Sequence, residues 1–305
     1  MRVFVTGVAG QLGHDVMNEL SKRGIEGVGS DLAPAYSGMP DGTAVTKMPY
    51  MGCDITDEEA VFAAICASEC DAVVHCAAFT AVDLAEEKED VCRKVNALGT
   101  ENIAKACAKL DIPMMYFSTD YVFNGEGTRP WQVDDPYEPL GVYGKTKAEG
   151  EAAVRKLLRK YFILRIAWVF GANGKNFIRT MLRLSKDHDS LKVVSDQVGT
   201  PTYTYDLARL IVDMIFTDKY GIYHVTNEGE YISWYEFAKA IFKEAGVTNV
   251  TVFPVSSEEY GAKAKRPYNS RMDRSKIAEQ GFEPLPTWQD ALARYVAYLK
   301  ETGEA

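Results

Sequence analysis

The sequence lacks the long apolar runs that cross membranes, and it lacks blocks of basic residues. No apolar span approaches the roughly 20 residues that a membrane helix needs. The net charge is −9 and the lysines and arginines are dispersed, which argues against nucleic acids and anionic membranes as main partners. We also expect no secretory leader, because residues 2–6 already have the composition of a buried strand.

The cysteine and histidine patterns of metal sites and disulfide frameworks are also missing. The six cysteines all fall in the first half of the chain, without a Cys-x-x-Cys pair or a histidine cluster. In a chain of 305 residues with 47% hydrophobic and 25% charged residues, we expect them to be reduced thiols of a cytoplasmic protein. No internal repeat or low-complexity tract interrupts this globular composition.

Short apolar segments alternate with helical patterns as far as residue 170. This alternation predicts an α/β fold, a Rossmann-like doubly wound parallel sheet with its ligands beyond the carboxyl ends of the strands. We expect residues 1–170 to form a dinucleotide-binding domain, which 203–226 rejoin. A smaller discontinuous C-terminal lobe, 171–202 and 227–305, would bind the substrate in a cleft between the two.

Three glycines follow the first predicted strand and open a helix: Gly7, Gly10 and Gly13. Glycines here permit a tight turn, and the helix N-terminus offers free N–H groups to a pyrophosphate, although glycines also simply make turns. The next strand ends in Asp31, whose carboxylate can accept ribose hydroxyls and repels a 2′-phosphate, which favours NAD over NADP. It can equally cap a loop. Asp54 and Ile55 are placed to flank the adenine.

The pair Tyr143 and Lys147 opens a charged helix, where residues four apart share a face. A free phenol titrates near pH ~10, and an ammonium within about 4–6 Å lowers that pKa by roughly 1–3 units. A tyrosine tuned in this way can give a proton to a carbonyl oxygen while hydride arrives at the carbon. Thr119, at the end of the preceding strand, can offer a second hydroxyl to the same oxygen.

The Tyr-x-x-x-Lys spacing alone is weak, because it also occurs at Tyr235 and Lys239. That copy lies in the amphipathic stretch 234–242, whose Trp, Phe and Ile belong to a core face, so we interpret it as structural. Two other polar residues carry less information. His75 sits mid-strand among apolar neighbours and is expected to be a packed core histidine, whereas Asn96 either braces the sheet or is an exposed amide.

Six segments along nearly the whole chain together resemble the dTDP-4-dehydrorhamnose reductase family of the extended short-chain dehydrogenases/reductases. They are residues 7–13, 77–83, 118–123, 143–147, 196–202, and 266–267 with 269–271. Ser-Thr-Asp-Tyr-Val-Phe (118–123) and Asp-Gln-Val-Gly-Thr-Pro-Thr (196–202) resemble this family most specifically. The glycine turn and the Tyr-x-x-x-Lys pair are shared across the superfamily.

The resemblance implies reduction of the 4-keto group of dTDP-4-dehydro-β-L-rhamnose to dTDP-L-rhamnose with NADPH or NADH. Tyr143 would be the proton donor, Lys147 would hold the nicotinamide ribose and lower the tyrosine pKa, and Thr119 would assist. The positions that match the family's cofactor site are Gly10, Gln11, Leu12, Asp31, Asp54, Ile55, Ala77, Ala78, Thr80, Tyr143 and Lys147, beside Gly7 and Gly13 of the turn. Those that match its sugar-nucleotide site are Thr119, Asp120 and Trp168.

One departure concerns metal. Some members of the family form a dimer bridged by magnesium through glutamates, and Asp15 and Tyr205 stand at those places here. Because Tyr205 is no hard carboxylate ligand, we expect no required metal, and either a monomer or a homodimer. Two other functions stay open: another nucleotide-sugar epimerase or reductase of the superfamily, and a non-catalytic regulatory subunit resembling that of methionine adenosyltransferase.

Overall fold

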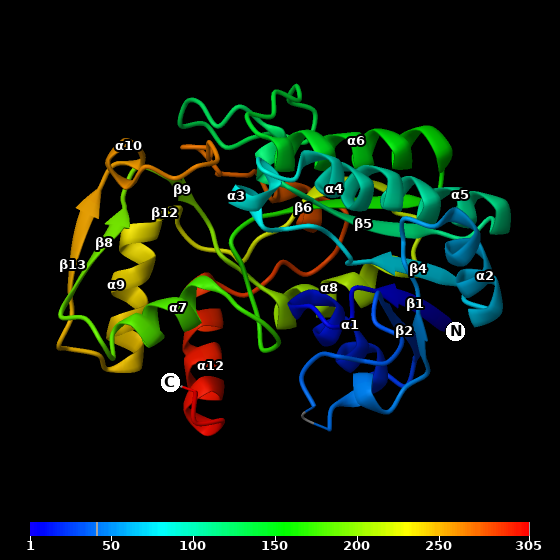
Figure 1. Cartoon of the computed structure of the whole chain (residues 1–305), viewed down its shortest axis with the longest axis horizontal. Helices are drawn as coiled ribbons and strands as arrows, with labels where there is room; N and C mark the ends of the chain where they lie inside the picture. The colour runs from blue at the N-terminus through cyan, green and yellow to red at the C-terminus, as the bar shows by residue number, and fades with distance from the viewer. Residues whose placement is uncertain (41, 305) are drawn as a thin grey trace.

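Seven parallel strands form the central sheet of the protein, in a computed structural model that describes residues 1–40 and 42–304 (Figure 1). The strand order is β11-β6-β5-β4-β1-β2-β3. Their bounds are β1 Arg2–Thr6, β2 Glu26–Asp31, β3 Tyr50–Gly52, β4 Ala72–His75, β5 Met114–Thr119, β6 Tyr161–Ile166 and β11 Gly221–His224. The predicted Rossmann-like doubly wound sheet is confirmed.

Helices cover both faces of this sheet (Figure 1). One face carries α1 (Gln11–Lys22) and α8 (Thr204–Ile215), and the other carries α2 (Glu58–Ser68), α5 (Thr100–Leu110) and α6 (Val142–Leu157). The central strands are apolar on both sides for this reason. In β1, for instance, Val3 and Val5 pack into the core under α1 and α8, whereas Phe4 between them packs into the opposite core.

The carboxyl ends of β1 and β4 mark the point at which the strand order reverses. From β1 the chain passes outward to β2 and β3, and it then returns to β4 on the other side of β1. In doubly wound sheets a crevice opens at this point and holds the ligand. Thr6 and His75 end β1 and β4, and both are in register with each other and with Ser30, one residue before the end of β2. The loops that follow these strands therefore lie together on one rim.

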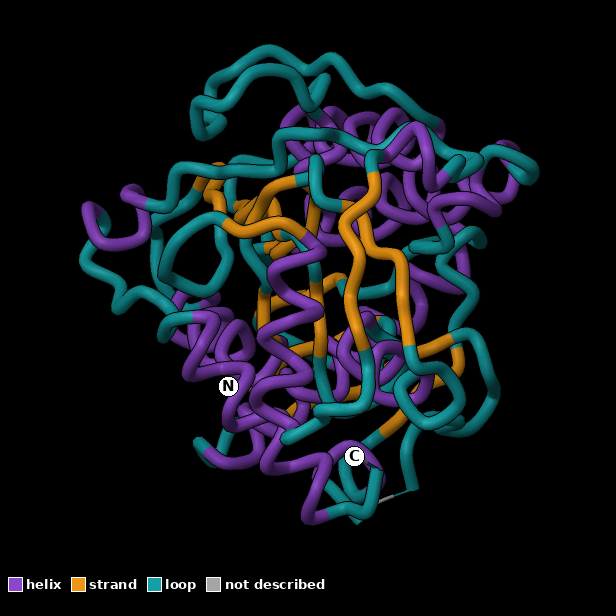
Figure 2. Tube along the Cα trace, turned by 90° about the vertical axis from the view of Figure 1, so that its left-hand side faces the viewer, coloured by secondary structure: helices purple, strands orange, loops and turns teal. Residues whose placement is uncertain are grey.

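A second lobe stands beside the carboxyl-end rim (Figure 1) and faces the viewer in Figure 2. Its core lies among α7 (Phe177–Leu184), α9 (Trp234–Ala245) and α12 (Trp288–Glu301), with β8 (Ser190–Val194) paired to β13 (Thr251–Val255). Two short pairs, β7 (Val169–Phe170) with β10 (Thr202–Tyr203) and β9 (Val198–Gly199) with β12 (Ile232–Ser233), connect it to the sheet domain. The short helices are α3 Val82–Ala85, α4 Glu89–Arg93, α10 Ser257–Tyr260, α11 Ser275–Glu279, and the 3₁₀ turns Ala44–Thr46 and Asp120–Val122.

The helical stretch that runs from Glu89 to Leu110 is interrupted. Between α4 and α5 the residues Lys94–Gly99 form a π-helical turn, a rare geometry that often occurs at functional sites. At this turn the side chain of Asn96 leaves the helix surface: its Oδ1 accepts from the Phe79 N–H at 2.8 Å and its Nδ2 donates to the Phe79 carbonyl at 3.1 Å. Asn96 therefore braces the loop that follows β4.

None of the helices in the described ranges, 1–40 and 42–304, is long and apolar enough to cross a membrane.

Candidate active site

Two adjoining cavities occupy the rim. The first, which we call the nucleotide cavity, measures about 400 Å³ and is bounded by the glycine turn, the end of β2 and residues 53–55. The second, the catalytic cavity, measures about 430 Å³ and lies between the glycine turn, the end of β5, α6 and the second lobe. They share four lining residues, Gly7, Gly10, Cys76 and Ala78, so together they form one elongated site.

The glycine turn is shaped for close backbone approach. Gly7 has φ +71°, in the left-handed region, and a Cβ there would lie 2.6 Å from the Ala77 nitrogen. A Cβ on Gly13 would lie 2.4 Å from the Gly7 carbonyl oxygen. Helix α1 begins at Gln11 without a side-chain cap, so its first N–H groups remain for an anion. This cradle fits the pyrophosphate of a dinucleotide.

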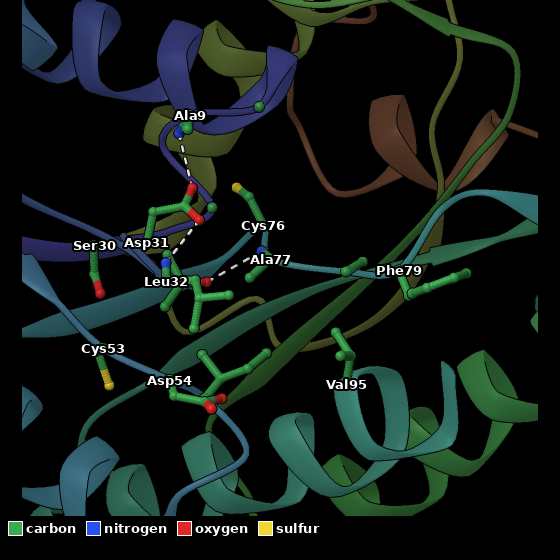
Figure 3. A pocket seen from close by; sticks show the side chains of 15 residues that line it. Ala9, Ser30, Asp31, Leu32, Cys53, Asp54, Cys76, Ala77, Phe79 and Val95 are labelled. Atoms are coloured by element: carbon green, nitrogen blue, oxygen red, sulfur yellow. Dashed lines mark hydrogen bonds between the residues drawn. The ribbon is translucent and has the colours of Figure 1, made fainter. Parts of the chain in front are cut away.

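Two carboxylates, Asp31 and Asp54, line the nucleotide cavity (Figure 3). Asp31 accepts from the Ala9 N–H at 2.9 Å through Oδ2, and from the Leu32 N–H at 2.8 Å through Oδ1. Asp54 lines the same cavity beside Ile55, and no lysine or arginine is among the described lining residues. Asp31 therefore caps its loop and also lines the cavity, and its predicted role toward the ribose stays a prediction.

Helix α6 brings Tyr143 and Lys147 into the catalytic cavity. It can lie close to the end of β5 because Gly144 has no side chain: a Cβ there would lie 2.2 Å from the Tyr121 carbonyl oxygen. The ring of Tyr121 meets that of Tyr143 edge-on, with centroids 5.4 Å apart. Glycine beside the tyrosine therefore lets α6 lie against the turn that follows β5.

The expected lowering of the Tyr143 pKa is not found. Burial raises the pKa of Tyr143 well above its ordinary value, the nearby Asp120 carboxylate raises it further, and only a hydrogen bond with Thr119 opposes them. The ammonium of Lys147 lies instead 4.2 Å from the ring centroid of Tyr116. The prediction was wrong because spacing along a helix carries no information about desolvation. A phenol with a raised pKa is protonated at neutral pH, which is the form that a proton donor needs.

Lys147 is buried, and this burial lowers its pKa to about 7. Glu151, one turn further along α6, attracts the ammonium and is the largest of the effects that oppose the lowering. Glu151 itself forms a fully buried bidentate pair with Arg165 of β6, with both N–O distances 3.0 Å. The guanidinium also lies 5.0 Å from the rings of Phe123 and Tyr137. The buried Glu151 carboxylate and Arg165 guanidinium therefore neutralise each other next to Lys147 of the catalytic cavity.

Thr119 ends β5, and Asp120 begins the 3₁₀ turn that follows it. The Thr119 hydroxyl donates to Asp120 Oδ1 at 3.1 Å and accepts from the Tyr121 N–H at 3.2 Å. Asp120 is buried, and burial raises its pKa to about 6, although hydrogen bonds from Ser270 and Thr119 oppose that rise. The Ser270 hydroxyl donates to Asp120 Oδ2. The segment Asn269–Arg271, which the sequence marked without a role, thus fixes the orientation of a cavity carboxylate.

Two stacked indoles close the cavity on the side of the second lobe. Trp168 lies parallel to Trp234, with ring centroids 3.8 Å apart and an interplanar angle of 17°. Trp168 has φ +52°, an uncommon backbone conformation for a bulky residue and a type of strain that clusters at binding sites. Trp234 was assigned to a core face from sequence. It does pack against the core of the second lobe, but it also lines the catalytic cavity.

Every residue predicted for the site lies on one of the two cavities. The nucleotide cavity is lined by Gly7, Gly10, Asp31, Asp54, Ile55, Ala77 and Ala78. The catalytic cavity is lined by Gly7, Gly10, Gln11, Leu12, Gly13, Ala78, Thr80, Thr119, Asp120, Tyr143, Lys147 and Trp168. The second Tyr-x-x-x-Lys copy lines neither, and Lys239 lies over the ring of Tyr235 at 5.1 Å on α9.

The carboxylate that replaces the family's first magnesium ligand is engaged by protein groups. Asp15 accepts a short hydrogen bond from the Thr204 hydroxyl and pairs with the His14 ring at 3.1 Å. Tyr205 is half exposed and lies under the ammonium of Lys22. Within the described part of the chain, no three His, Cys, Asp or Glu side chains cluster as metal ligands would.

The doubly wound sheet, the glycine turn and the Tyr-Lys pair at its rim define the short-chain dehydrogenase/reductase type of protein, in its extended form with a second lobe. A family model described as the RmlD substrate binding domain matches residues 1–301. The chain belongs to this family, that of the dTDP-4-dehydrorhamnose reductases.

Individual relatives cover almost the whole chain. It is 39% identical over 295 residues to the spore coat polysaccharide biosynthesis protein SpsK of Bacillus subtilis, with 97% of this chain and 96% of that one covered. It is 38% identical to the dTDP-4-dehydrorhamnose reductase of Aggregatibacter actinomycetemcomitans, with 98% and 99% covered. The crystal structure of the Bacillus anthracis dTDP-4-dehydrorhamnose reductase in complex with NADP superimposes with a TM-score of 0.88 at 37% identity, covering 97% and 99%.

Proposed function

We propose that this protein reduces the 4-keto group of dTDP-4-dehydro-β-L-rhamnose to dTDP-L-rhamnose, using NADH or NADPH. The observation that carries the proposal is the convergence of Tyr143, Lys147 and Thr119 in a single cavity that adjoins the glycine turn. Membership of the reductase family supports the choice of substrate.

The residues divide the work as follows. A reduced nicotinamide, when bound, supplies a hydride to the carbonyl carbon. Tyr143, which like any phenol carries its proton at neutral pH, gives that proton to the oxygen, and Thr119 turns its hydroxyl toward the same oxygen. Lys147 stabilises the phenolate that this transfer leaves behind. Trp168, with Trp234 stacked on it, provides an apolar wall for the sugar, and Asp120 accepts from a sugar hydroxyl.

Four finer assignments belong to the same proposal. The acidic end of the nucleotide cavity supports a preference for NADH over NADPH, because a 2′-phosphate would meet Asp31 and Asp54 without a basic partner among the described lining residues. The engaged state of Asp15 supports a reductase that requires no metal. Six unpaired thiols support work in the reducing cytoplasm. The division of labour is a cofactor domain, 1–170 with 203–226, and a substrate lobe, 171–202 with 227–305, in a monomer or homodimer.

The test is a reductase assay on dTDP-4-dehydrorhamnose with NADH and NADPH in separate series, with and without EDTA. We expect net consumption of reduced cofactor with formation of dTDP-rhamnose, faster with NADH and insensitive to EDTA. Tyr143→Phe should lower kcat by roughly 10²–10⁴-fold and leave the cofactor Kd nearly unchanged. Epimerisation without net cofactor consumption, or a stable complex with another protein and no turnover, would replace the proposal by one of its rivals.

A further inference from the structure

Tyr116 of β5 lies directly beneath the ammonium of Lys147. The side chain of Tyr116 is fully buried, and its ring centroid is 4.2 Å from Lys147 Nζ. Its hydroxyl donates to the Lys147 backbone carbonyl at 3.2 Å. The same side chain thus holds Lys147 at both ends, through the ring face at the ammonium and through the hydroxyl at the backbone of α6.

The helix is shaped to accept this tyrosine. A Cβ on Gly150 would lie 2.4 Å from the Tyr116 hydroxyl oxygen and 2.8 Å from the Asn96 carbonyl oxygen, so only glycine lets α6 approach here. Gly150 lies three residues after Lys147 and therefore next to it on the helix surface. The contact between ring and ammonium depends on this absent side chain, as the position of Tyr143 depends on Gly144.

A second ring lies beside that of Tyr116, and it belongs to a neutral group. The imidazole of His75 lies parallel to it at 6.0 Å and an angle of 20°. The Thr100 hydroxyl donates to the Asn96 carbonyl, so it accepts from His75 Nε2–H, and the bare Nδ1 accepts from the Thr6 hydroxyl at 2.8 Å. Burial first, and Lys147 second, lower the pKa of His75 to about 3. Because His75 is neutral, the cation that the Tyr116 ring contacts here is the Lys147 ammonium.

The other groups that face the ammonium supply limited compensation. Glu151 on α6 is already paired with Arg165, while Cys92 of α4 and Cys76 after β4 are thiols whose pKa burial raises. The phenol of Tyr143 is likewise held neutral by burial. An ammonium taken out of water beside such neighbours tends to lose its proton. The negative π-face of Tyr116 is a permanent partner that opposes this loss.

We propose that Tyr116 is a positioning residue that keeps the Lys147 ammonium charged and in place at the catalytic cavity through the face of its ring. This proposal rests on the proposed function only where it connects Lys147 to turnover. A desolvated cation–π contact of this kind shifts the pKa of a lysine by about one unit.

The experiment measures Lys147 itself in the cofactor-free protein. Carbamylation by cyanate requires the neutral amine, so its rate at Lys147, followed by mass spectrometry across pH, gives the midpoint of the lysine titration. We expect Tyr116→Leu to move that midpoint about one pH unit lower, because the ring no longer favours the ammonium. Tyr116→Phe keeps the ring, and its midpoint should stay with that of the unchanged protein.

A size-matched series removes the effect of the cavity that leucine leaves. Replacing Tyr116 by phenylalanine, then by mono- and trifluorophenylalanine, weakens the π-face at nearly constant volume, so the midpoint should fall stepwise. The high-pH limb of kcat/KM for cofactor should fall with it. A midpoint that stays constant across the fluorinated series overturns the proposal. Absence of turnover with the proposed sugar, while the labelling midpoint still shifts, would refute the proposed function and leave this inference standing.

Discussion

The nucleotide cavity and the catalytic cavity adjoin on one rim but are built in opposite ways. The first is made of backbone and small side chains: the turn at Gly7, the uncapped start of α1 and the two-pronged contact of Asp31. The second is made of buried ionisable side chains whose pKa values are displaced, Tyr143, Lys147 and Asp120, above the buried Arg165–Glu151 pair. We therefore expect binding of the nucleotide to depend on close approach to the backbone, and catalysis to depend on buried charges that neighbouring groups stabilise. Substitutions in the nucleotide cavity should mainly change cofactor affinity, whereas substitutions in or under the catalytic cavity should mainly change stability or turnover.

The largest effect is expected beneath the catalytic cavity. Arg165→Met leaves Glu151 buried without its partner, which should lower the free energy of unfolding by about 3–5 kcal/mol, measured by urea denaturation. Arg93→Met removes an arginine whose partners, Glu89 and Glu149, are half exposed, and should cost less than about 1 kcal/mol. If both variants lose the same free energy of unfolding, the buried Arg165–Glu151 pair matters no more to stability than an exposed one.

At the nucleotide end the sharpest test is a single methyl group. Gly7→Ala forces a Cβ against the backbone of residues 76–77 at a positive φ, and should weaken cofactor binding about 100-fold by calorimetry. Gly24→Ala introduces the same strain, with φ +67°, but nothing lies within 4 Å of its Cβ. That control should lose some stability and keep its cofactor Kd. If cofactor binding weakens to a similar extent in both variants, the glycine turn is not the part of the protein that holds the cofactor.

Thr119→Val separates chemistry from binding. It removes the hydroxyl beside Tyr143 at nearly constant volume, so kcat should fall about 10- to 100-fold while the cofactor Kd holds. Steady-state kinetics and a fluorescence titration provide the two numbers. Thr119→Ser retains the hydroxyl and should recover most of the rate. If cofactor affinity falls instead, Thr119 contributes to cofactor binding and not to the chemical step.

The smallest effect concerns cofactor choice. Asp31→Asn removes the negative charge and keeps an oxygen for the Ala9 or Leu32 N–H, so the ratio of kcat/KM for NADPH to that for NADH should rise about tenfold. Asp54→Asn in the same cavity shows how much of the discrimination belongs to each carboxylate. If neither variant changes the ratio, the Asp31 and Asp54 carboxylates do not discriminate against the 2′-phosphate of NADPH.

These differences also explain which features the sequence could predict. The sheet and the glycine turn follow from local patterns, because alternation of apolar segments and a strand-glycine-helix order are written in consecutive residues. The roles of Trp234 and Ser270 were missed, since Trp234 is also a sound core residue of α9 and Ser270 meets Asp120 across 150 positions of chain. The pKa of Tyr143 was predicted in the wrong direction, because helix spacing brings Lys147 near but cannot show that burial dominates or that Tyr116 holds the ammonium.

The parallel indoles of Trp168 and Trp234 have an optical consequence. Their electronic transitions couple at a centroid distance of 3.8 Å, and one ring lies between β6 and β7 while the other begins α9 of the second lobe. We expect a circular-dichroism couplet from this pair that changes when the two rings move relative to each other. Docking of a sugar nucleotide against these rings can thus be followed in unlabelled protein, independently of any turnover.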